Sequence, residues 1–62
     1  MKPPDDAEVA DWLRRAADDR RTAELVLPHG LYDIVGFHCQ QEAEKRLKAL
    51  LVAAGTTPPM VP

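Results

Sequence analysis

Apolar residues recur at helical spacing in two proline-free stretches of this chain. In the first stretch, about residues 5–27, apolar residues at intervals of three and four lie on a single arc of a helix, and charged residues such as Asp11, Arg14 and Asp18 lie outside it. The members of this arc are Val9, Trp12, Leu13, Ala16, Ala23 and Leu27. Asp5 or Asp6 can cap the start, and Pro28 stops the pattern. The spacing predicts a helix over about 5–27.

The second stretch, about residues 32–54, carries the clearer apolar stripe. Its members follow one another at intervals of 4, 4, 3 and 4 residues, namely Cys39, Ala43, Leu47, Leu50 and Ala54. Gly55 suits the left-handed position just past the end of a helix. The pattern predicts a second helix over about 32–54, on which Cys39 is a small buried hydrophobe.

The connection between the two stretches, residues 28–32, is short enough to make the helices antiparallel neighbours. We therefore expect an all-α fold, an antiparallel two-helix hairpin. Phe37 and Leu51 lie to one side of the stripe, so the second helix has a wider apolar arc than one neighbour can cover. We predict assembly into a four-helix or larger bundle. The residues expected to form its core and association surface are Trp12, Leu13, Phe37, Leu47, Leu50 and Leu51.

Composition narrows the classes of protein. A chain of 62 residues forms one domain, and a core of this size supplies only about 3–5 kcal/mol of net stability. The single cysteine cannot form an intrachain disulfide, which indicates a reducing, cytoplasmic setting. The longest apolar run is far below the roughly 20 residues of a membrane span, so no membrane association is expected. A net charge of −2 gives no overall attraction to nucleic acid. Self-association is the remaining source of stability.

Polar side chains form a column beside the apolar face of the second helix. Gln41, Glu44 and Lys48 follow one another at spacings of 3 and 4, and Lys45 flanks them. One interpretation is a solvated strip with a Glu44–Lys48 pair, which contributes little to stability. The other is a polar network partly buried at a helix interface, where satisfied groups fix the register of association. Spacing leaves both interpretations open.

Three other residues invite a chemical interpretation. Arg20 falls inside the apolar arc of the first helix, where it either extends its guanidinium to solvent or pairs with Glu44 or another carboxylate across the hairpin or interface. His38 and Glu42 have a spacing that suits two metal ligands. A zinc site needs three or four converging ligands, however, and Cys39 points about 100° away from His38 on the same helix. Nucleophile–base pairs and phosphate-binding glycine loops are missing from the sequence. We therefore expect no catalytic residue, metal or cofactor.

The second helix resembles the signature of HEPN domains (higher eukaryotes and prokaryotes nucleotide-binding). The matching string is Phe37-His38-Cys39-Gln40-Gln41-x-x-Glu44-Lys45-x-Leu47-Lys48-Ala49-Leu50-Leu51, followed by Gly55 and Pro58. The first-helix pattern of the family is matched by Trp12-Leu13, Ala16, Asp19 and Ala23, so that the resemblance spans Trp12 to Pro59. Arg20 stands where the family prefers Leu, and Glu42 stands where it prefers a small residue.

The resemblance implies an up-and-down helical bundle that usually dimerises. Many members are ribonucleases or toxins of toxin–antitoxin pairs, often encoded beside a minimal nucleotidyltransferase, and others bind nucleotides or are non-catalytic modules. The family's catalytic motif, Arg-x4–6-His, lies in later helices, whereas Arg21 and His29 here are seven residues apart and stand elsewhere. Residues 1–62 thus resemble a HEPN hairpin that is truncated relative to the full domain. The family-matched polar positions, expected to organise the bundle, are Gln41, Glu44, Lys45 and Lys48.

These observations favour a HEPN-like module that forms homo-oligomers and has no catalysis of its own. The alternative is the N-terminal part of a HEPN ribonuclease toxin whose catalytic Arg-x4–6-His lies beyond residue 62. A third, weaker hypothesis is nucleotide binding at the polar strip of the second helix. The family resemblance alone suggests the possible partners, which are a nucleotidyltransferase antitoxin, RNA and nucleotides.

Overall fold

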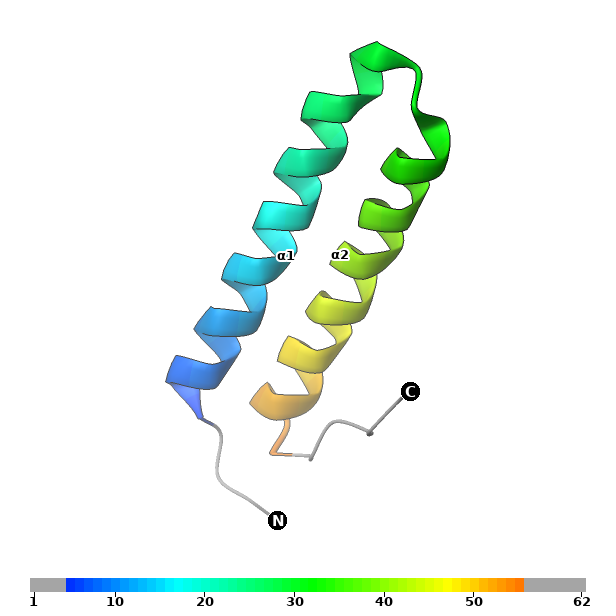
Figure 1. Cartoon of the computed structure of the whole chain (residues 1–62). Coiled ribbons are helices and arrows are strands. Elements are labelled where there is room, and N and C mark those ends of the chain that lie inside the picture. Colours follow the sequence, from blue (N-terminus) through cyan, green and yellow to red (C-terminus); the bar gives the residue numbers. More distant parts are fainter. Residues whose placement is uncertain (1–4, 56–62) are drawn as a thin grey trace.

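A computed structural model describes residues 5–55, which form two long helices joined by a tight connection (Figure 1). Helix α1 spans Asp6–Val26, the short 3-10 helix η1 spans Leu27–His29, and helix α2 spans Tyr32–Ala53. The two long helices run side by side in opposite directions. The predicted all-α hairpin is confirmed, with helix bounds within one residue of those expected from the sequence.

The ends of the helices follow from local backbone chemistry. The Asp5 carboxylate accepts a 3.0 Å hydrogen bond from the backbone N–H of Glu8 and so caps α1. Pro28 has no N–H to continue the helix, and the chain tightens into η1. Gly30 then reverses the chain with φ of 73°, and Gly55 takes φ of 77° after α2. These left-handed conformations are those that glycine adopts without steric cost.

The interface between α1 and α2 is built from small side chains. The apolar residues buried among those described are Ala16, Ala23, Ala49 and Val52. Three of the four are alanines, which let the helices approach closely but remove little apolar area from water. The contact between the helices therefore supplies only a small hydrophobic contribution to stability.

The apolar stripe predicted on the second helix does not face α1. Cys39 is exposed, so its interpretation as a buried hydrophobe is wrong for this hairpin, and Ala43, Leu47 and Leu50 are exposed with it. The interface uses a different set of α2 residues, centred about 150° around the helix from the stripe. This set includes His38, Lys45, Ala49 and Val52. A polar contact to Asp19 and small residues, rather than the largest apolar side chains, determine which face of α2 meets α1.

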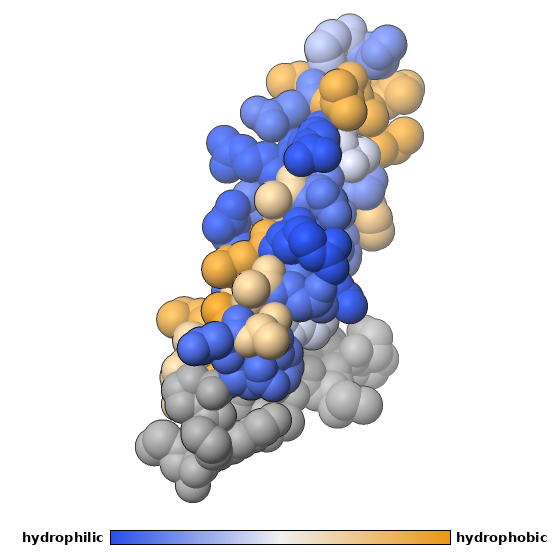
Figure 2. All heavy atoms as spheres, turned by 90° about the vertical axis from the view of Figure 1, so that its left-hand side faces the viewer, coloured by the Kyte–Doolittle hydropathy of each residue, from blue (hydrophilic) through white to orange (hydrophobic). Residues whose placement is uncertain are grey.

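Many large hydrophobic side chains of the described residues remain in contact with solvent. Figure 2 shows the α1 side of the hairpin, where hydrophilic residues cover most of the surface and hydrophobic ones gather near the connection and along one edge. The exposed large hydrophobics are Leu13, Leu25, Leu27, Leu31, Tyr32, Ile34, Phe37, Leu47 and Leu50. The described hairpin buries alanines and leaves several leucines exposed, so a large apolar surface remains available to pack against another element.

Candidate functional site

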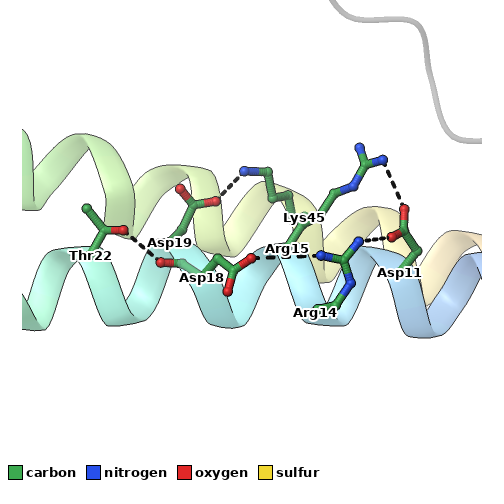
Figure 3. A network of polar contacts seen from close by, with 7 residues as sticks. All are labelled: Asp11, Arg14, Arg15, Asp18, Asp19, Thr22 and Lys45. Carbon is green, nitrogen blue, oxygen red and sulfur yellow. Dashed lines mark hydrogen bonds and ion pairs between the residues drawn. The ribbon is translucent and has the colours of Figure 1, made fainter.

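A buried carboxylate lies at the centre of the helix interface. Asp19 of α1 is 7% exposed and receives two partners from α2. Its Oδ1 is 2.8 Å from Nδ1 of His38, and its Oδ2 is paired with Nζ of Lys45. Figure 3 shows Asp19 and Lys45 pointing toward each other from the two helices. Because His38 and Lys45 are seven residues apart on α2, they lie on the same face of that helix and both reach Asp19.

The electrostatics of this cluster follow from its hydrogen bonds. The hydrogen bond from Lys45, and then that from His38, lower the pKa of Asp19 below its ordinary value of 3.8, while burial acts in the opposite direction. Asp19 is therefore ionised at neutral pH and can only accept hydrogen bonds. It follows that Nδ1 of His38 carries a hydrogen and donates it to Asp19.

Trp12 lies on the same side of the hairpin as Asp19. Its ring lies 4.8 Å from Nζ of Lys48 on α2 and 5.2 Å from the guanidinium carbon of Arg15 on α1. Both distances are within the range of cation–π contacts. Trp12 thus links the helices through Lys48, one turn of α2 beyond Lys45. We call the side chains of Trp12, Asp19, His38, Lys45 and Lys48 the Asp19 cluster.

The outer surface of α1 carries a chain of exposed ion pairs (Figure 3). Arg14 pairs with Asp11 and, at 3.9 Å, with Asp18, while Arg15 is 3.0 Å from Asp11. The hydroxyl of Thr22 donates a 2.9 Å hydrogen bond to the carbonyl of Asp18. These side chains are well exposed, so each pair contributes a few tenths of a kcal/mol.

The structure separates the four polar positions that the sequence groups together. Gln41, Lys45 and Lys48 are partly buried, whereas Glu44 is exposed. Lys45 enters the network with Asp19, as in the second interpretation of the polar column, and Lys48 turns to Trp12. The contact of Lys45 with Asp19 joins α2 to α1 within one hairpin.

Sequence reasoning overlooked Asp19 and His38 as members of the site. A signal was present, because Asp19 lies three residues after Ala16 and four before Ala23, in the middle of the apolar arc. A charged residue at such a position requires a buried partner.

A second surface lies on the opposite side of the hairpin from the Asp19 cluster, where apolar side chains flank a charged centre. Nη1 of Arg20 is 3.7 Å from Oε2 of Glu42, and Nη2 of Arg46 is 3.0 Å from the same oxygen. Toward the open end, Leu13 and Leu50 line one shallow hollow. Toward the connection, Leu27 and Cys39 line another. We call this surface the Leu50 face; its residues are Leu13, Arg20, Leu27, Cys39, Glu42, Arg46 and Leu50.

The remaining predicted association residues occupy other positions. Phe37 is exposed and packs its ring edge-to-face against His38, with centroids 5.2 Å apart. Leu51 and Trp12 are partly buried. Leu47 lies on the outer side of α2, next to the Leu50 face.

Two kinds of site are missing from the part of the chain that the structure describes. Within residues 5–55, no three His, Cys, Asp or Glu side chains converge to hold a metal ion. Neither α1 nor α2 combines the length and hydropathy needed to cross a lipid bilayer.

Comparison with known families agrees with this geometry. Residues 9–61 match the family model of the HEPN domain, so the match covers both helices and most of the chain. The chain belongs to the HEPN-domain family. Comparisons with curated proteins and with solved structures returned no match.

The two departures of this HEPN chain from the expected pattern are in contact with each other. Arg20 and Glu42, which stand where the sequence resemblance favours Leu and a small residue, form the ion pair at the centre of the Leu50 face. The guanidinium of Arg20 does not simply extend to solvent, since it meets a carboxylate across the hairpin. Glu42, rather than Glu44, is that carboxylate.

Proposed function

We propose that this HEPN hairpin is a self-associating module with no catalysis of its own. The observation that carries the proposal is the inverted distribution of apolar side chains. The described hairpin buries mostly alanines, whereas Leu50 is 64% exposed, Leu47 is 54% exposed and Leu13 is 42% exposed. A second copy of the chain provides the apolar surface that these leucines lack.

The contact within the hairpin and a contact between two copies differ in the apolar side chains that they can bury. Full burial of one exposed leucine is worth about 1.5–3 kcal/mol, and each copy brings at least three of them. Among the described residues, the apolar side chains buried by the intrachain contact are no larger than valine, and Trp12 and Leu51 are only partly buried. Association therefore stands to contribute as much hydrophobic stabilisation as the hairpin itself.

The Asp19 cluster supports a structural rather than a catalytic role. Both carboxylate oxygens of Asp19 have partners, and the carboxylate is buried between the helices. A general base needs an accessible lone pair in reach of a substrate, and Asp19 offers none. The cluster instead aligns α1 with α2, so that the Leu50 face is presented in one fixed geometry.

A pair of leucine variants of equal exposure tests the proposal. Leu50 and Leu25 are 64% and 67% exposed, but Leu25 lies on the outer side of α1, away from the Leu50 face. Sedimentation velocity at micromolar concentrations is expected to show a dimer or higher oligomer for the parent chain. Leu50→Ala should weaken this assembly by about tenfold or more in dissociation constant, and Leu25→Ala should leave it unchanged.

Two results would contradict the proposal. A compact, stably helical monomer at these concentrations would show that the leucines need no partner. Equal effects of the two alanine variants would show that the assembly is a non-specific association of apolar side chains.

A further inference from the structure

Helix α2 has two faces that differ in how well they suit a contact with α1. The face that meets α1 buries Ala49 and Val52 as its apolar residues. The face about 150° away carries four exposed residues, which we call the Cys39 stripe: Cys39, Ala43, Leu47 and Leu50. Its leucines are 54% and 64% exposed, so their burial would remove more apolar area from water. Apolar burial alone therefore favours a packing that the structure does not adopt.

The surroundings of Asp19 show what opposes that packing. Its carboxylate contacts His38 and Lys45, so the stretch of α2 between these two residues lies beside it. The Cys39 stripe contributes Cys39 and Ala43 to this stretch, and neither side chain carries a positive charge. If the stripe faced α1, Asp19 would be buried against it while both of its partners pointed elsewhere. A buried carboxylate that has lost its partners is strongly destabilising.

The other polar contacts between the helices constrain the rotation of α2 less strongly. Arg20 reaches Glu42 at 3.7 Å and is 63% exposed, so this pair contributes little. Lys48 lies over the ring of Trp12, but an indole that loses a cation is not left as a buried charge. Among residues 5–55, Asp19 is the one charged side chain that is buried. The orientation of α2 therefore depends mainly on this carboxylate.

We propose that Asp19 holds the Cys39 stripe away from α1, and that the sequence has a second hairpin packing, with the stripe buried against α1, which becomes the stable one when residue 19 is apolar. Asp19 stabilises one packing through Lys45 and His38 and disfavours the other because it has no partner there. The stripe thus stays available to a second copy of the chain instead of being buried within one hairpin. That consequence rests on the proposed self-association, whereas the second packing does not.

The native thiol of Cys39 reports which face of α2 meets α1. Cys39 is exposed, so the thiol reagent DTNB should modify it readily in the parent chain. In Asp19→Leu the thiol is buried between the helices and reacts only when the hairpin opens, so the rate should fall about tenfold or more. Asp18→Leu is the matched control, because Asp18 is 59% exposed and lies one position away. This control should react at the parental rate.

Dilution separates protection within a chain from protection by a second copy. A partner that covers Cys39 dissociates as the concentration falls, whereas α1 of the same chain does not. The rates are therefore compared in the dilute limit, with circular dichroism of each variant at the same concentration. An Asp19→Leu chain that is helical and as reactive as Asp18→Leu in this limit would overturn the inference.

A second variant tests the inference with the carboxylate in place. The triple substitution H38A/A43K/K45A moves the cation that Asp19 needs from the buried face of α2 to the Cys39 stripe. We expect α2 to turn so that the introduced cation reaches Asp19, and the Cys39 thiol to be protected as in Asp19→Leu. The matched control H38A/K45A gives Asp19 no partner on either face and should remain reactive. A triple variant as reactive as this control would overturn the inference, whether it is folded or not.

The mass of Asp19→Leu distinguishes this inference from the proposed self-association. Sedimentation equilibrium should give the mass of one chain at concentrations where the parent chain associates. A protected thiol in an Asp19→Leu chain that still associates would contradict the role of the stripe in association. A parent chain that is itself monomeric would contradict the self-association, and the dilute-limit thiol rates would still decide between the two packings.

Discussion

The buried carboxylate of Asp19 contacts two side chains of α2 at once, and its removal should be costly. Asp19→Ala deletes the acceptor of both Lys45 and His38, whose side chains are each 24% exposed. A hydrogen bond to a charged group contributes about 1.5–3 kcal/mol. Lys45 and His38 can turn partly to water once the carboxylate is gone, so the two contributions do not add in full. We expect a loss of about 2 kcal/mol in the free energy of unfolding.

The neighbouring residue provides a matched control. Asp18 has a side chain that is 59% exposed, and its contact with Arg14 is long at 3.9 Å. Asp18→Ala removes the same charge one position away and should change the free energy of unfolding by less than about 0.5 kcal/mol.

Denaturation by urea, followed by helical circular dichroism, measures both variants. The experiments must use one protomer concentration, because association contributes to the apparent stability. An Asp19→Ala variant that loses no more stability than Asp18→Ala would refute the view that the Asp19 cluster holds the hairpin together.

Three further predictions follow from the same structure. Because its folded-state pKa is lowered, Asp19 stabilises the fold at pH values above its ordinary pKa of 3.8, and that stabilisation is lost as the pH falls through the lowered folded-state pKa. The stability difference between the parent chain and Asp19→Ala should accordingly shrink in urea titrations as the pH is lowered from about 5 through the lowered folded-state pKa of Asp19. Gly30→Ala forces a β-carbon into φ of 73° and should destabilise the hairpin by about 1 kcal/mol, whereas Gly36→Ala, which meets open space within α2, should stabilise it by about 0.5–1 kcal/mol. Ala16→Leu should separate the helices and cost about 1–3 kcal/mol by thermal denaturation, because Ala16 is fully buried in a close contact.

Sequence periodicity was sufficient to predict the two helices and their ends. Asp5, Pro28 and Gly55 act through the local backbone, so their effects can be derived without knowledge of the partner helix. The antiparallel arrangement followed from the length of the connection.

Periodicity did not determine which face of α2 meets α1. The stripe that contains Cys39 and Leu50 is the most apolar face of α2. Hydrophobicity alone therefore predicts that this face packs against α1. In the structure the ionic contact of Asp19 with Lys45 and the small size of Ala49 direct another face toward α1. A periodic pattern indicates that a helix has an apolar face, but which element packs against that face depends on contacts between residues distant in the sequence.

The central claim, that the hairpin is one half of a bundle, is tested most directly by the mass of the chain in solution. Sedimentation equilibrium at several micromolar concentrations gives that mass without assumptions about shape. The exposed leucines of the Leu50 face predict at least twice the mass of a single chain, falling toward one chain on dilution. A mass of one chain at every concentration, with full helicity retained, would contradict the account.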